Sequence, residues 1–284
     1  MHTIPGGPFA REKAIPPEVL KNIEARYHLN DPLWKQYLDY IKNLTRWDLG
    51  PSFKYKTTSV NEIIKKSFPV SATLGALAVG IALIVGVLSG VIAALNHNKW
   101  QDYLAMVVAT IGFAVPSFIL AGVLMYVFAY KLRWFPAALW GSPSQMVLPA
   151  LALAGMPTAV VARFMRSNLL EVMQQDYIRT ARAKGLSQQV VVYKHALRNA
   201  SLSIITYLGP LVAGIFTGSF VVESIFAIPG LGQYFVSSIT NRDYTVILGV
   251  TVFYSIFLIT MNLLVDLAYV WVDPRIRFSK GGEG

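Results

Sequence analysis

The sequence predicts an all-α polytopic membrane protein. The chain has 284 residues, of which 54% are hydrophobic and only 14% are charged. This balance is too apolar for a soluble protein, whose surface must be largely polar. Five runs without Asp, Glu, Lys, Arg or His reach or approach the roughly 20 residues that a helix needs to cross about 30 Å of hydrocarbon. The runs are continuous rather than alternating, which favours helices over a β-barrel.

Five spans follow from these runs. The first contains small side chains at every fourth position, a ridge that lets another helix approach closely. Packing within the chain and contact with a partner subunit are both open explanations of this ridge. The third span is the least regular, because its apolar run is the shortest and contains Pro149 and Pro157. The spans lie near residues 71–95, 104–130, 145–165, 201–222 and 245–271, and the ridge comprises Ala78, Ala82, Gly86, Gly90 and Ala94.

The positive charges assign the two faces of the membrane. Residues 96–103, 163–200 and 273–284 together contain eleven Lys and Arg. Residues 131–144 and 223–244 contain only three. Because basic residues gather in cytoplasmic loops, the first set, which includes the C-terminus, is predicted to be cytoplasmic.

The N-terminal segment 1–66 is then predicted to lie outside. It also has eleven basic residues, but seven acidic residues partly balance them and the rule weakens for long segments. Within this segment Asp31 is the expected N-cap of a short helix, with Pro32 at its first helical position. The predicted apolar face of this helix comprises Leu33, Tyr37, Ile41 and Leu44.

The composition excludes most catalytic chemistry. The chain has no Cys, and its four His lack the spacing of metal ligands, so we expect no disulfide, metal or cofactor. No GxSxG, HExxH or GxxxxGK[ST] motif is present, so we do not expect an enzyme. The apolar runs themselves, 71–95, 104–130, 145–162, 201–222 and 245–265, also lack the intramembrane charges that couple transport to ions. If the protein moves a solute uphill, the energy must come from another subunit.

The predicted cytoplasmic loop 166–200 has strong helix signals. Residues 169–184 are rich in helix formers and stop at Gly185, a natural C-terminal glycine. Ser187 can cap a second helix, which would expose an apolar stripe. Such a stripe can contact anionic lipid, pack on the chain's own spans or dock in a groove of another protein. The stripe comprises Leu186, Val190, Tyr193 and Leu197, with Lys194, His195 and Arg198 towards the end of the helix.

The run "TARAKGLSQQVVVYKHALRNA" resembles the cytoplasmic loop of ATP-binding-cassette (ABC) importer permeases. The general pattern there is EAA, three residues, Gly, nine residues, then I-x-L-P. Ala181 and Gly185 match it, and Leu197 falls at the family's leucine. The differences from the general pattern are typical of the peptide and nickel permease subfamily, and they occur at Arg179, Thr180, His195 and Arg198.

Other segments resemble the same subfamily over nearly the whole chain, among them "WDLGPSF", "LPALALA", "VVESIFAIPGLGQYFVSSITNRDY" and "VDPRIR". The start "HTIPGGPF" resembles the first-named of its two permease subunits, where this motif follows the first transmembrane helix. We therefore expect a sixth span before Met1. The resemblance implies an external segment 1–66, a type I ABC importer transmembrane domain over 67–272 and a cytoplasmic tail 273–284.

The resemblance implies a permease that moves di- or oligopeptides across the cytoplasmic membrane. Nickel or another small solute is an alternative cargo, and a passive channel or membrane scaffold is an alternative of another class. The implied partners, besides the lipid bilayer, are a second homologous permease subunit, two ABC ATPase subunits and an extracytoplasmic substrate-binding protein. We expect no nucleic-acid partner.

The resemblance also implies that this loop seats a coupling helix in a cleft on an ATPase. Gly185 would be the turn from which the helix projects. Leu186, Val190, Tyr193 and Leu197 would form its hydrophobic plug. The remaining candidate site residues are Ala181 and the cations that would orient the plug against acidic groups, namely Arg182, Lys184, Lys194 and Arg198. Membrane topology alone is the alternative explanation for these cations, and packing on the chain's own spans is the alternative for the plug.

Overall fold

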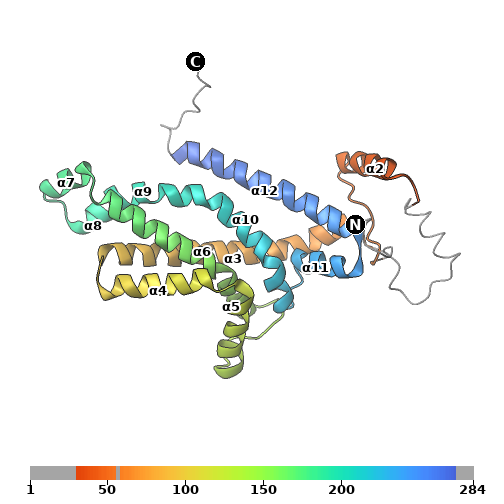
Figure 1. Cartoon of the computed structure of the whole chain (residues 1–284), viewed down its shortest axis with the longest axis horizontal. Helices are drawn as coiled ribbons and strands as arrows, with labels where there is room; N and C mark the ends of the chain where they lie inside the picture. The colour runs from red at the N-terminus through yellow and green to blue at the C-terminus, as the bar shows by residue number, and fades with distance from the viewer. Residues whose placement is uncertain (1–29, 56–57, 273–284) are drawn as a thin grey trace, which may run out of the picture. The chain divides into compact units, whose positions relative to one another are not determined.

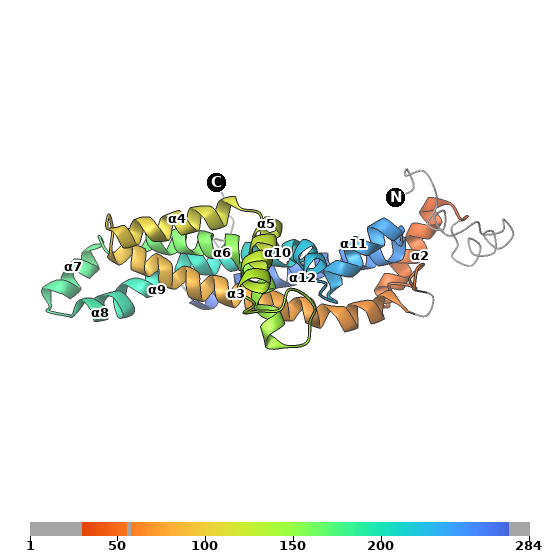
Figure 2. The ribbon, with the colours of Figure 1, turned by 90° about the horizontal axis from the view of Figure 1, so that it is seen from below.

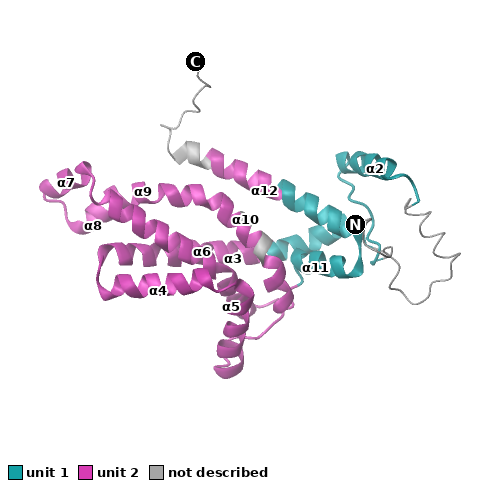
Figure 3. Ribbon diagram, viewed as in Figure 1, with its two compact units in different colours: residues 1–71, 229–256 teal, residues 72–228, 257–284 magenta. Residues whose placement is uncertain are grey.

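The computed structural model describes residues 30–55 and 58–272, which are helical apart from turns and loops. Within these ranges the one extended pairing is an isolated antiparallel bridge between Pro51 and Ser59. The predicted all-α class is confirmed. The chain divides into two compact units (Figure 3), residues 1–71 with 229–256 and residues 72–228 with 257–284.

The described residues contain four single helices long and apolar enough to cross a membrane. A bent pair of helices makes a fifth candidate, which agrees with the five predicted spans. The four are α3 (Val60–Leu95), α6 (Pro143–Val172), α10 (Leu202–Ile225) and α12 (Tyr244–Val272). The bent pair is α4 (Trp100–Ala114) followed by α5 (Ser117–Leu124) and the π-helix η1 (Met125–Lys131).

The helix expected over 104–130 is not continuous. It bends by 110° between α4 and α5. Pro116 has no N–H to donate to the preceding turn. A proline also pushes the residue before it out of the helical region, and Val115 is extended, with φ −91° and ψ 117°. In the sequence, this break corresponds to a single proline within an otherwise apolar run.

Helix α3 begins at Val60, well before the expected start near residue 71. Its 36 residues make it about 54 Å long, so it exceeds the hydrocarbon thickness and its polar first turns can extend beyond the bilayer. The helix passes through Pro69 without ending. The domain boundary expected between residues 66 and 67 therefore falls inside a helix.

The first unit contains α2 (Leu33–Thr45), α11 (Leu231–Asn241) and the starts of α3 and α12. The buried Asp243, just before α12, links two distant parts of this unit. Its carboxylate accepts hydrogen bonds from the Ser52 hydroxyl, from the Phe53 N–H at 3.2 Å and from the Val246 N–H at 3.3 Å. The last of these caps α12. Helix α11 was not anticipated from the sequence.

Helix α2 confirms the short helix predicted in the N-terminal segment, but not its cap. Pro32 occupies the N-cap position, and the carbonyl of Asp31 accepts a hydrogen bond from Gln36 Nε2 at 2.7 Å. No side chain of α2 is buried among the described residues. Three members of the predicted apolar face, Leu33, Tyr37 and Ile41, are exposed.

The second unit is built around α6, whose buried side chains include Leu148, Met165 and Leu169. Helices α3, α4 and α6 lie side by side in two perpendicular views (Figures 1 and 2). Between α6 and α10 the chain forms the α6–α10 connection, which we define as residues 173–201. It contains α7 (Asp176–Ala183), α8 (Gln188–Val190), the π-helix η2 (Val191–Ala196) and α9 (Leu197–Ala200).

The small-residue ridge of α3 packs within the chain. A Cβ on Gly86 would lie 2.8 Å from the Cβ of Val161. A Cβ on Gly90 would lie 2.6 Å from the carbonyl oxygen of Ala162. Because glycine has no Cβ, the backbones of α3 and α6 approach closely at these two positions. Packing within the chain therefore explains these two glycines of the ridge.

We expect Gly90→Ala to destabilise the folded protein, because its methyl group would collide with the backbone of α6. Overpacking of this kind costs about 1–3 kcal/mol, measurable as a lower midpoint of thermal unfolding in detergent. The control is Gly80→Ala on the same helix, where a Cβ meets no atom within 4 Å. Equal unfolding midpoints for the two variants would contradict the close approach of α3 and α6.

Candidate functional site

The α6–α10 connection turns at Gly185. The Gly185 N–H donates to the Arg182 carbonyl at 2.9 Å, and the Leu186 N–H donates to the Ala181 carbonyl at 3.4 Å. These two bonds form a Schellman helix end, which requires a left-handed residue at Gly185, and its φ is +77°. A Cβ there would meet no atom within 4 Å, so the requirement for glycine is conformational rather than steric. The predicted helix end at Gly185 is confirmed, but the helix predicted over 169–184 is interrupted at residues 173–175, between α6 and α7.

One side of the connection forms a small core of its own. Helix α7 contributes Ile178 and Ala181, and the returning segment packs against it with η2. Ala181, one of the candidate site residues, is therefore buried in this core. The buried residues of the returning segment are Val191, Val192, Ala196 and Ala200.

The other side of the connection exposes three apolar side chains, which we call the apolar trio. Leu186 and Val190 are each 39% exposed and Tyr193 is 68% exposed. The fourth residue of the predicted stripe, Leu197, is only half-buried rather than exposed. The stripe was predicted from α-helical spacing, but residues 191–196 form a π-helix. A π-helix has more residues in each turn, so different side chains face outwards.

Four exposed cations accompany the apolar trio, namely Arg182, Lys184, Lys194 and Arg198. In the described part of the chain none of them forms an ion pair with an acidic side chain. An unpaired set of positive charges beside apolar groups suits a partner surface that has both a hydrophobic groove and acidic residues.

Two hydrogen bonds brace the connection, and the sequence patterns did not reveal either. Asn199 Nδ2 donates to the hydroxyl of Tyr177 at 2.7 Å, which joins α9 to α7. Asn168 Nδ2, on α6, donates to the carbonyl of Ala200 at 3.1 Å. The connection is thus attached directly to the long helix α6. The only sequence signal was that Asn199 belongs to the run that resembles the permease subfamily.

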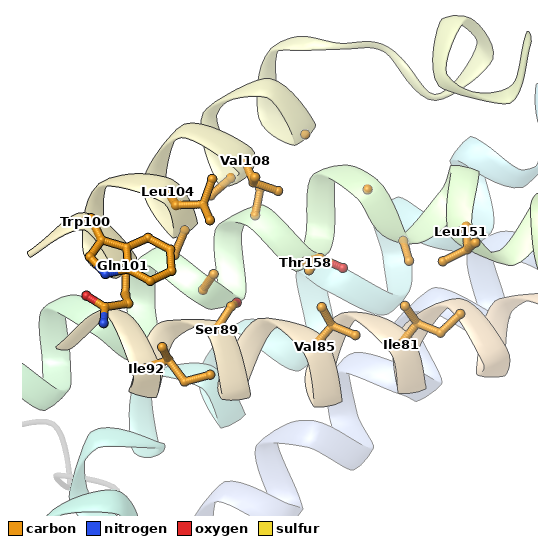
Figure 4. A pocket seen from close by; sticks show the side chains of 17 residues that line it. Ile81, Val85, Ser89, Ile92, Trp100, Gln101, Leu104, Val108, Leu151 and Thr158 are labelled. Carbon is orange, nitrogen blue, oxygen red and sulfur yellow. The ribbon is translucent and has the colours of Figure 1, made fainter. Parts of the chain in front are cut away.

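A groove of about 500 Å³ lies between α3, α4 and α6 (Figure 4). Its lining is almost wholly apolar, and its polar side-chain groups are those of Ser89, Gln101 and Thr158 and the indole N–H of Trp100. A binding site for a polar solute needs several converging polar groups, which this groove lacks. The labelled lining residues come from α3 (Ile81, Val85, Ser89, Ile92), α4 (Trp100, Gln101, Leu104, Val108) and α6 (Leu151, Thr158).

Residues 86–278 match the family model described as a binding-protein-dependent transport system inner membrane component. The chain is 55% identical over 282 residues to the dipeptide transport system permease protein DppB of Bacillus subtilis, covering 99% of this chain and 92% of that protein. It is 48% identical over 280 residues to the oligopeptide transport system permease protein OppB of Haemophilus influenzae, covering 98% and 92% of the two chains.

Solved structures show the same fold. A chain of the MetNI methionine ABC transporter, in an inward facing conformation, superposes with a TM-score of 0.64 at 16% identity, covering 74% of this chain and 96% of that chain. A chain of an amino acid ABC transporter superposes with a TM-score of 0.59 at 18% identity, covering 74% and 94%. The predicted type I importer transmembrane fold is confirmed.

Members of this family are multi-pass membrane permeases that act with separate ATPase subunits and a substrate-binding protein, and they are not themselves enzymes. The chain belongs to this family, the binding-protein-dependent transport system inner membrane components, and is a permease subunit of an ABC importer.

Proposed function

We propose that the chain is the permease of an ATP-driven peptide importer and that an ATPase subunit binds its α6–α10 connection. The relatives named as dipeptide and oligopeptide permeases support peptides as the cargo. The observation that carries the docking surface is the apolar trio beside four unpaired cations. An apolar patch of this kind on a solvent-exposed loop indicates an interaction site.

The positive-inside rule supports the orientation of this assembly. Residues 163–200 contain seven Lys and Arg, so the connection and the C-terminus are cytoplasmic and the segment 1–66 is external. A second homologous permease completes the pathway, and each permease binds one ATPase. A substrate-binding protein delivers the peptide from outside.

The braced connection suits the transmission of force. When ATP draws the two ATPases together, the docked apolar trio moves with them. The Schellman turn and the Asn199–Tyr177 bond keep the connection in one shape. The bond from Asn168 to Ala200 then transfers the displacement to α6, and the spans switch between inward-facing and outward-facing states. The chain itself needs no nucleotide site.

Peptide uptake tests this function. In proteoliposomes that contain the chain, a second permease, the ATPases and the binding protein, we expect labelled di- to pentapeptides to accumulate only when ATP is supplied. An excess of nickel ions should not reduce the uptake. Uptake without ATP would favour a channel, and competition by nickel would contradict the peptide assignment.

The turn at Gly185 gives a second prediction. Gly185→Val forces a β-branched residue into the left-handed region at a cost of about 1–3 kcal/mol. We expect it to reduce ATP-dependent uptake severalfold and to weaken co-purification of the ATPase. Gly185→Asn is the control, because Asn tolerates this conformation and a Cβ has space there. If both variants behaved alike, the shape of the turn would not matter for coupling.

A further inference from the structure

A buried ion pair joins the start of α4 to α6. Arg166 Nε and Nη2 donate to the two carboxylate oxygens of Asp102 at 2.6 and 2.7 Å. Only 3% of the Asp102 side chain and 24% of the Arg166 side chain are exposed. A two-pronged contact of this kind fixes the orientation of the guanidinium as well as its distance, which a lysine ammonium would not do.

The turn between α3 and α4 closes around the same carboxylate. The Asn98 N–H donates to Asp102 Oδ2 at 3.0 Å. His97 Nδ1 lies 3.2 Å from that oxygen and 3.1 Å from Arg166 Nη2, so it either donates to the carboxylate or accepts from the guanidinium. Asp102 also lies in the first turn of α4, where the helix dipole favours an anion. One carboxylate therefore holds the turn, α4 and α6 together.

Further contacts continue along α4 and α6. Arg163 Nη2 donates to Thr110 Oγ1 at 3.0 Å, and its guanidinium lies 5.2 Å from the ring centre of Phe113. A Cβ on Gly112 would lie 3.1 Å from the carbonyl of Gly155, so the two backbones are close. With the contacts of α3 at Gly86 and Gly90, helices α3, α4 and α6 form one packed body.

This body is directly connected to the α6–α10 connection. Asn168, which bonds to Ala200, lies on α6 only two residues beyond Arg166. A displacement of the connection therefore reaches the ion pair within one helical turn. Separating the pair would leave a buried charge without compensation, so every state in which α4 and α6 move apart is disfavoured.

We propose that Asp102 and Arg166 are positioning residues for transport, whose ion pair makes α3 and α4 follow α6 when the α6–α10 connection moves. The proposal rests on the docking of an ATPase to that connection. Without the ion pair, α3 and α4 follow the motion of α6 less closely, and ATP is hydrolysed with less transport.

The test compares transport with hydrolysis in the complete reconstituted importer. For Asp102→Asn, which keeps the shape but removes the charge, we expect ATPase association and peptide-stimulated hydrolysis to persist while peptide transported per ATP falls about tenfold. Arg166→Lys should restore part of the coupling that Arg166→Gln loses. The double variant Asp102→Asn with Arg166→Gln should be no worse than either single variant, because the two residues act as a pair.

The control is Asp31→Asn, which removes the partner of Lys35 in an ion pair at the start of α2. The side chains of this pair are more exposed than those of Asp102 and Arg166, and the variant should leave the coupling ratio unchanged. An unchanged coupling ratio in assembled Asp102→Asn and Arg166→Gln complexes would overturn the proposal. Losses that add fully in the double variant would also overturn it.

A distance measurement tests whether α3 and α4 move with α6 even if these variants fail to assemble. The chain has no cysteine, so spin labels can be attached to Lys99→Cys on the α3–α4 turn and Ser167→Cys on α6, both exposed. We expect one distance that is the same without nucleotide and with ATP bound. A distance that changes with ATP would overturn the proposal. If instead the ATPase did not dock on the α6–α10 connection, the unsubstituted complex would show no peptide-stimulated hydrolysis.

Discussion

In lipid the hydrophobic effect does not drive helices together, because the lipid tails are as apolar as the helices. The helices of the second unit must therefore be held together by other interactions. Its helices associate through close backbone approach and interhelical polar contacts instead. Gly86 and Gly90 bring α3 against α6, and Gly112 brings α4 against α6. The Asp102–Arg166 pair adds a directional contact at one end of the same three helices. The long helix α6 is the common partner in each case.

The α6–α10 connection has two faces with opposite properties. The inner face buries Ile178, Val191 and Val192 and gives the connection a core of its own. The outer face leaves Leu186, Val190 and Tyr193 exposed. A stable fold does not require the second face, since the inner core and the brace to α6 already hold the connection. The ATPase subunit that we propose as a partner would cover these side chains.

The sequence predicted the features that depend on local chemistry. Long uncharged runs identified the spans, Gly185 marked a helix end, and small residues at every fourth position of α3 marked a packing face. It did not predict features set by contacts between distant residues. Asp102 and Arg166 are 64 positions apart, and each resembles an ordinary charge at the end of a span.

Other differences between the sequence prediction and the structure concern the backbone, because the spacing of apolar residues does not show where a helix bends or changes its type. The bend at Pro116 and the passage of α3 through Pro69 show that one residue type has opposite outcomes in different surroundings. The π-helix at Val191–Ala196 changed the outer face of the connection, because the predicted stripe assumed uniform α-helical spacing. Helix α11 was missed because it lies in a segment with turn-forming residues on both sides.

Site-directed cross-linking can show whether an ATPase subunit binds the α6–α10 connection. Because the chain has no cysteine, Tyr193→Cys introduces a single site for a short cysteine-reactive photo-cross-linker. Tyr130→Cys on η1 is the matched control, since Tyr130 is 69% exposed and Tyr193 is 68% exposed. We expect a covalent product of permease and ATPase from Tyr193→Cys and none from Tyr130→Cys. No such product from Tyr193→Cys in an active complex, or equal yields at both sites, would contradict this expectation.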